Sequence, residues 1–187
     1  LVQDADSQKR AVGAFNVGNM EMVIGAVTAA EELDTPIILQ IAQLRLDHSP
    51  LSLMGPMMVS AAQDARVDIA VHLDHGQTEE TVREALLLGF SSVMFDGSRY
   101  KFSENVRMTS RIAAMARASG VSMEGELGVV GGGESGNTDH KTACTEPNLA
   151  REFAEKTGVD ALAVAVGNAH GHYMTEPKLQ FDVLQRI

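Results

Sequence analysis

Residues 68–73, DIAVHL, form a near-continuous apolar run that leads directly into Asp74, His75 and Gly76. A strand that is apolar at nearly every position is covered on both faces, as strands are in a parallel sheet. Stretches with helical character flank the run, at 50–65 and at 78–88. The central part of the chain therefore predicts a buried parallel strand between two helices.

The same β–α unit recurs along the rest of the chain. Five further apolar runs have the same character, and they lie at 11–17, 36–42, 91–96, 121–127 and 161–166. Regular βα units predict a (β/α)₈ barrel or a doubly wound sheet, and no GxGxxG motif follows the first run to favour dinucleotide binding. We therefore expect an α/β fold, a (β/α)₈ TIM barrel with about six of its eight βα units in these 187 residues.

The chain begins with Leu1 and ends in PKLQFDVLQRI at 177–187, which has the pattern of a helix in progress. We expect residues 1–187 to be a single TIM-barrel domain that is incomplete at both ends. A length of 187 residues suits one domain with a substantial core.

Charge and composition narrow the classes of partner. The formal net charge is −10 and no basic patch is evident, which argues against nucleic acid and against a membrane surface. The single cysteine, Cys144, excludes a disulfide within the chain and favours a reducing cytoplasm. No apolar run approaches the ~20 residues that a membrane span needs. We therefore predict a cytoplasmic protein with a small-molecule substrate.

Polar residues gather where the predicted strands end, which is the face of a barrel that carries active sites. Histidine and carboxylate together suit zinc or a similar divalent metal. The alternative is that these side chains only form structural hydrogen bonds and ion pairs. The residues are Asn16, His72, Asp74, His75, Asp96, Ser98, Glu124, Glu126, Asn168, His170 and His172.

Short motifs are spread over nearly the whole chain: AVGAFNV at 11–17, HLDHG at 72–76, MFDGS at 94–98, EGELG at 124–128, GGGE at 131–134 and AVGNAHGHY at 165–173. Together these motifs resemble those of the class II, metal-dependent ketose-bisphosphate aldolases. That family includes the fructose-bisphosphate and tagatose-bisphosphate aldolases. The resemblance implies a TIM barrel and a lyase of carbohydrate metabolism, such as glycolysis. It also implies cleavage or formation of a ketose (bis)phosphate through a zinc-stabilised enediolate of dihydroxyacetone phosphate.

The resemblance also implies roles for individual residues. Asp74 matches the catalytic acid/base that moves a proton on the aldehyde-derived hydroxyl. Glu134 matches the loop residue that helps remove or return the C–H proton. His75 and His170 match two of the three zinc ligands. The family carries the third histidine and the main phosphate loop in its seventh and eighth strands, beyond residue 187.

Four further positions follow from the same resemblance. Asp96 and Glu126 match positions that can hold a second or alternative metal, and a monovalent cation is a further candidate cofactor. Gly171 matches a backbone contact to the dihydroxyacetone-phosphate half of the substrate. Asn16, at the end of the first strand, is expected to bind substrate. The implied partner is a small phosphorylated sugar, and we expect a homodimer or homotetramer.

Two departures from the family pattern leave the particular ketose phosphate open. The family often has a serine after strand two, where this chain reads Ala42-Gln43, and a histidine after DGS, where it has Arg99. Two other functions remain as alternatives. One is a non-catalytic barrel that acts as the partner subunit of an aldolase-type complex. The other is a metal-dependent hydrolase, which the lack of a His-x-His pair after the first strand disfavours.

Overall fold

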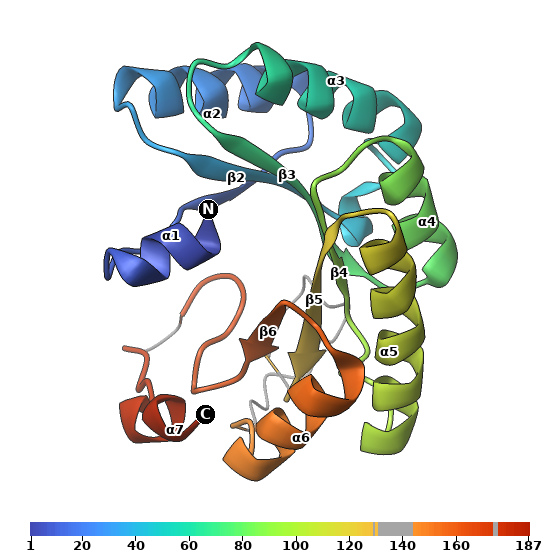
Figure 1. Ribbon diagram of the computed structural model, residues 1–187. Helices are drawn as coiled ribbons and strands as arrows, with labels where there is room; N and C mark the ends of the chain where they lie inside the picture. Colours follow the sequence, from blue (N-terminus) through green and yellow to red (C-terminus); the bar gives the residue numbers. More distant parts are fainter. Residues whose placement is uncertain (129, 131–143, 174–175) are drawn as a thin grey trace.

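The computed structural model describes residues 1–128, 130, 144–173 and 176–187. Its core is a six-stranded sheet in the order β1-β2-β3-β4-β5-β6, in which every neighbouring pair is parallel. The sheet curls into part of a barrel, with helices along its outside (Figure 1). The strands are β1 (Ala14–Asn16), β2 (Ile37–Ala42), β3 (Ile69–Gly76), β4 (Ser92–Phe95), β5 (Ser122–Leu127) and β6 (Ala161–Val164).

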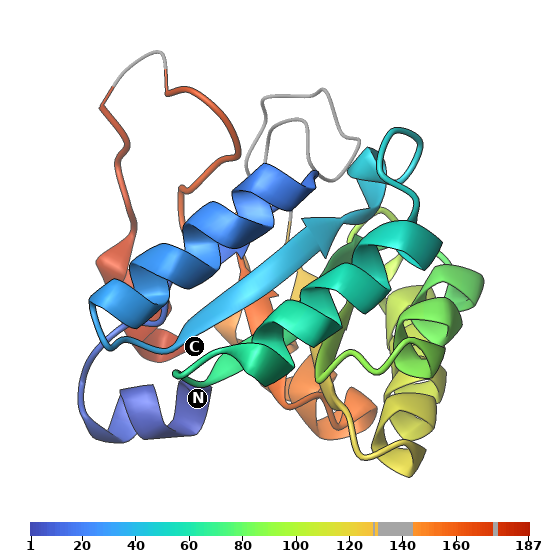
Figure 2. The ribbon, with the colours of Figure 1, turned by 90° about the horizontal axis from the view of Figure 1, so that it is seen from above.

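Helices connect the strands and cover the convex face of the sheet. Figure 2 shows α2 and α3 running alongside strand β2 between them. The short helices α1 and α7 lie on the open side of the arc in Figure 1. The helices are α1 (Val2–Ser7), α2 (Met20–Glu32), the 3₁₀ helix η1 (Gln43–Arg45), α3 (Leu51–Asp64), α4 (Glu79–Leu87), α5 (Phe102–Ala118), α6 (Pro147–Thr157) and α7 (Phe181–Arg186).

The α/β fold predicted from the sequence is confirmed as a half-barrel of six parallel strands. The expected strands are all present, although β1 is shorter than the predicted 11–17 and β3 continues three residues beyond 73, to Gly76. Helix α5 begins at Phe102 after Lys101, so Ser103 lies inside its first turn and does not cap it.

Side-chain caps explain why several helices start where they do. Asn19 accepts a hydrogen bond from the Met22 amide at the start of α2, and Thr78 accepts one from the Thr81 amide at the start of α4. Each cap pairs an amide that the first helical turn leaves without a partner. Both capping residues follow the ends of strands, so the chain turns into a helix at the rim of the barrel.

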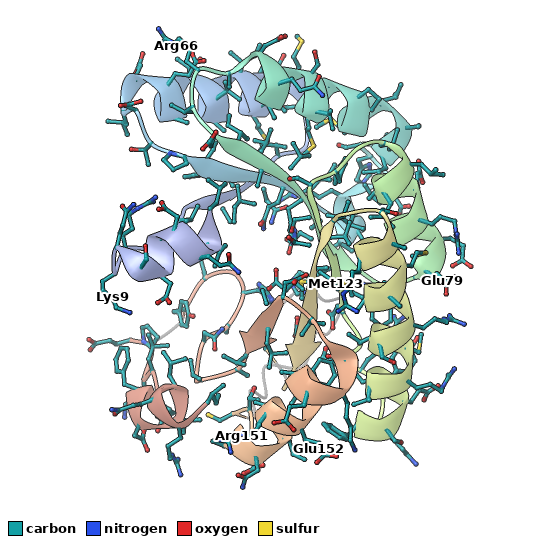
Figure 3. The ribbon with its side chains drawn as sticks, viewed as in Figure 1. Lys9, Arg66, Glu79, Met123, Arg151 and Glu152 are labelled. Carbon is teal, nitrogen blue, oxygen red and sulfur yellow. The ribbon has the colours of Figure 1, made fainter. Side chains whose placement is uncertain are left out.

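The two faces of the sheet have opposite character because strand side chains alternate. On β3, Val71 and Leu73 point outward into the apolar core beneath the helices. The concave face instead borders an interior cavity of about 770 Å³. Charged side chains on the outside, such as Arg66 and Arg151, point away from this interior (Figure 3). The polar residues that line the cavity include Gln40, His72, Asp74, His75, Glu124, Glu126 and His170.

Among the described residues, no helix has both the length and the apolar character that crossing a bilayer requires.

Candidate active site

A β-bulge near the end of β3 brings two consecutive side chains to the same face. Leu73 pairs with Val93 and Gly76 with Phe95, so β3 advances three residues while β4 advances two. The extra residue is accommodated at His75, whose φ of +47° lies in the left-handed region. Side chains 74 and 75 would otherwise point to opposite faces, yet both line the cavity. The bulge therefore puts Asp74 and His75 side by side.

Gly76 allows this bulge to pack tightly against β4. A Cβ atom at Gly76 would lie 2.5 Å from the carbonyl oxygen of Met94, which is backbone and cannot move aside. The Gly76 carbonyl accepts a hydrogen bond of 2.8 Å from the Asp96 amide. The glycine of the LDHG motif thus fixes Asp96 next to His75.

Two amide side chains hold the Asp74 carboxylate. Asn16 of β1 and Gln40 of β2 donate to Asp74 Oδ2 at 2.8 Å and 3.0 Å. The other oxygen, Oδ1, lies 3.9 Å from His75 Nε2. Asn16 Oδ1 is buried and has no hydrogen-bond partner within the described part of the chain. Asp74 is therefore oriented by neutral donors, beside an amide oxygen that can accept a hydrogen bond.

His75 also contacts two buried carboxylates. Its Nδ1 lies 2.9 Å from Asp96 Oδ2 and 3.5 Å from Glu126 Oε2. Ser98 fixes the other oxygen of Asp96, because both its amide and its hydroxyl donate to Asp96 Oδ1. His75, Asp96 and Glu126 each offer one potential ligand atom, and these three atoms lie within 4.8 Å of one another.

His170 approaches this cluster from the loop after β6. Its ring centroid lies 5.0 Å from that of His75, with an angle of 73° between the ring planes. Side chains from both sides shape the loop: Asn168 accepts from the Val166 amide, and the Tyr173 hydroxyl accepts from the Ala169 amide. The two imidazoles are therefore close enough to share one ion.

These donors fit a divalent metal. Imidazole nitrogen and carboxylate oxygen are the ligand types that zinc takes in proteins. Glu126 is 1% exposed, and its Oε1 has no hydrogen-bond partner among the residues that the structure describes. A buried carboxylate oxygen without a partner is costly unless a cation compensates it. His75, Asp96 and Glu126 can thus hold a metal, with His170 beside them.

The cluster has strongly shifted pKa values. Burial would lower the pKa of His75, but its hydrogen bond to Asp96 and the charges of Asp74, Glu126 and Asp96 raise the pKa to about 9. Burial raises the pKa of Glu126 to about 8, and the Asp96 charge adds to the increase. Burial alone would raise the pKa of Asp96, but the hydrogen bonds from His75 and Ser98 outweigh this effect and lower the pKa below its usual value. At neutral pH without a metal, His75 therefore carries a proton.

We expect metal affinity to rise with pH up to about 9. A metal binds neutral imidazole and ionised carboxylate, so binding at pH 7 must displace the proton of His75, and also that of Glu126 where Glu126 is a ligand. The apparent affinity should fall about tenfold per pH unit for each proton displaced as the pH is lowered. Zinc titration calorimetry between pH 6 and pH 9, in buffers of different ionisation enthalpy, measures both quantities. An affinity independent of pH, with no proton release, would show that His75 is not a ligand.

A second polar pair lies along the same inner face. His72 Nδ1 is 2.6 Å from the Ser92 hydroxyl, and His72 Nε2 is 3.5 Å from Glu124 Oε2. Burial lowers the pKa of His72 to about 4, and burial followed by the Asp74 charge raises the pKa of Glu124 to about 7. His72 is therefore neutral at pH 7 and is not a charged partner of Asp74.

The structure brings together most of the residues that the sequence singled out. Asp74, His75, Asp96, Glu126 and His170 form one cluster, and Asn16 joins it through Asp74. Gly171 follows His170 with an exposed backbone at φ +79°. Glu134 lies outside the described residues.

Two residues that contribute to the site were missed. Gln40 is the only polar residue in the run PIILQIA, and that was the available signal. Asn105 is buried in α5 and donates to the Glu126 carbonyl at 2.9 Å. Its Oδ1 would lie 2.0 Å from a Cβ at Gly97, next to Asp96. Asn105 thus links the chain segments that carry Asp96 and Glu126. A single polar residue within a helical stretch gave no signal of this role.

The fold and site together define a parallel α/β half-barrel with a candidate site for a divalent metal. The model of the family "Fructose-bisphosphate aldolase class-II" matches residues 1–187. The chain therefore belongs to the class II fructose-bisphosphate aldolase family.

Individual relatives agree with this assignment. The chain is 45% identical over 174 residues to a fructose-bisphosphate aldolase of Giardia intestinalis, covering 92% of this chain and 54% of that protein. It is 39% identical over 189 residues to a sulfofructosephosphate aldolase of Alkalicoccus urumqiensis, covering 100% and 66%. The crystal structure of the YdjI aldolase from Escherichia coli K12 superposes with a TM-score of 0.88 at 38% identity, covering 98% and 65%. The chain thus spans between about half and two thirds of the length of these relatives.

Proposed function

We propose that the protein is a metal-dependent aldolase that cleaves or forms a ketose phosphate, with dihydroxyacetone phosphate as one product or substrate. The observation that carries the proposal is the arrangement of Asp74 beside two imidazoles whose rings lie 5.0 Å apart. Relatives named for two different ketose phosphates support the reaction class and leave the particular sugar open.

The proposed metal ligands are His75 and His170, with Asp96 and Glu126 as ligands of a second or alternative position. When bound, zinc would supply a Lewis acid that stabilises the negative charge of an enediolate. His75 would have two functions: one ring nitrogen would bind the metal, and the hydrogen bond to Asp96 fixes the ring orientation. A monovalent cation remains a further candidate cofactor.

Asp74 is the proposed acid/base for the hydroxyl on the aldehyde-derived carbon. Asn16 and Gln40 occupy its Oδ2, which leaves Oδ1 to exchange the proton. The buried Asn16 Oδ1 is placed to accept a hydrogen bond from a substrate hydroxyl. The backbone of Gly171 is the proposed contact to the dihydroxyacetone-phosphate half. Glu134, outside the described residues, is the proposed group for the C–H proton.

The other expectations from the sequence stay predictions. They are a single TIM-barrel domain over 1–187, a cytoplasmic location, and a homodimer or homotetramer.

Chelation tests the reaction class. The intact zinc-loaded protein should release dihydroxyacetone phosphate from at least one of fructose bisphosphate, tagatose bisphosphate and sulfofructose phosphate. Removing the metal with a chelator should abolish release because the enediolate charge is then uncompensated, and added zinc should restore it. A coupled assay for dihydroxyacetone phosphate measures the rate. Intact protein that binds no zinc or cobalt and releases none of this product would instead be the non-catalytic partner subunit.

A further inference from the structure

Three loops at the carboxyl end of the sheet are tied together around one arginine. Arg99, in the loop after β4, donates from Nη2 to the Gln77 carbonyl at 3.2 Å and from Nη1 to Gln77 Oε1 at 3.3 Å. It also donates from Nη2 to the Tyr100 hydroxyl at 3.0 Å, with the guanidinium 5.0 Å from the centre of that ring. Gln77, after β3, donates its amide to Gln43 Oε1, after β2. The guanidinium is thus held in place from several directions.

All of these partners are neutral. Within the described part of the chain, no ion pair includes Arg99. The Arg99 side chain is exposed, so a ligand can reach it. A fixed cation without a carboxylate partner at this rim suits a small anion.

Arg99 lies close in space to the candidate metal site, because its partner Gln77 is near His75 in the chain. Gln77 is two residues beyond His75, and two residues span at most about 7 Å. The guanidinium, bonded to the Gln77 carbonyl, is therefore within roughly 10 Å of the His75 backbone. Arg99 also directly follows Ser98, which holds Asp96. This separation suits the two ends of a sugar chain, one at the metal and the other at the rim.

A second cation comes from the loop after β2. Arg45 is exposed, and its Nη1 lies 4.0 Å from where a Gly18 Cβ would be, at the end of β1 and the start of α2. Arg45 belongs to the same short helix as Gln43, whose side chain bonds the Gln77 amide. Arg45 and Arg99 therefore lie on the same carboxyl-end rim.

We propose that Arg99, assisted by Arg45, binds an anionic group, a phosphate or a sulfonate, on the aldehyde half of the substrate. The inference rests on the proposed aldolase function and makes that function specific for anionic aldehydes. The planar guanidinium presents paired donors that match the oxygens of such groups. Arg99 is thus a residue that sets specificity and takes no part in the proton transfers.

Arg99→Gln tests the assignment in the intact zinc-loaded protein. Condensation of dihydroxyacetone phosphate is measured with glyceraldehyde 3-phosphate and with uncharged glyceraldehyde, and the readout is the ratio of their kcat/KM values. Loss of a charged hydrogen-bonding group should lower this ratio about 10- to 100-fold, mainly through KM for the phosphorylated aldehyde. Arg99→Lys should lower it less. Arg151→Gln removes an equal charge on the exterior of α6 (Figure 3) and should leave the ratio at the wild-type value.

A ratio in Arg99→Gln equal to that of the wild type would overturn the proposal, because a structural role alone would affect both aldehydes alike. The same assay with phosphate replaced by sulfonate on the aldehyde shows which anion is preferred. If wild type turns over neither aldehyde, the aldolase function fails. In that case the anion site is tested separately, by calorimetric binding of glycerol 3-phosphate with dihydroxyacetone phosphate present. Binding about tenfold weaker in Arg99→Gln than in the wild type would support the anion site, and equal affinity would refute it.

Discussion

Asp74→Asn should lower kcat for ketose phosphate cleavage by about 10²- to 10⁴-fold, the range expected for loss of general acid–base catalysis. Asparagine has nearly the same shape and retains an oxygen that can accept from Asn16 and Gln40. It cannot take up the substrate proton. Bound zinc should remain, because Asp74 is not among the proposed ligands. Steady-state rates together with metal content measure both effects.

Asp68→Asn is the matched control for this variant. Asp68 is an exposed residue just before the other end of β3, so the same chemical change is made far from the cavity. Its kcat should equal that of the wild type. An Asp74→Asn protein that keeps zinc and wild-type turnover would remove Asp74 from the mechanism.

His170→Ala should weaken zinc binding by about 100-fold or more and abolish cleavage. Removing a residue that only hydrogen-bonds a metal ligand already lowers metal affinity about 10- to 100-fold. Removing a direct ligand should therefore lower it by at least the upper end of that range. The ring lies beside His75, and the loop after β6 that carries it is ordered by Asn168 and Tyr173. Metal content after dialysis against a competing chelator provides the measurement.

His172→Ala is the control for His170→Ala. His172 is two residues away in the same loop, is exposed, and should retain wild-type zinc affinity. If both variants lose zinc equally, the loss reflects damage to the loop, and if neither loses it, His170 is not a ligand.

Much of the fold was predictable because periodicity is a local property. The run DIAVHL is apolar on both faces, and this alone predicts a strand covered by other elements. The helical stretches at 50–65 and 78–88 were likewise indicated by local sequence, and helices α3 and α4 lie there. The strand-end rule then placed His75, Asp96, Glu126 and His170 on one rim before any contact was known.

The geometry of the site was not predictable in the same way. Regular alternation would send Asp74 and His75 to opposite faces, and only the register shift between β3 and β4 with a positive φ at His75 brings them together. Gln40 becomes relevant only when the register sets it opposite His72, within reach of Asp74. Both features depend on pairing between strands, which no single stretch of sequence contains.

His75 and His170 are expected to share one divalent cation next to Asp74. A crystal of the intact zinc-loaded protein, with diffraction recorded on both sides of the zinc absorption edge, tests it most directly. One strong anomalous peak is expected at about 2.0–2.1 Å from a ring nitrogen of each histidine. A zinc peak that contacts neither ring, or only one of them, would contradict it.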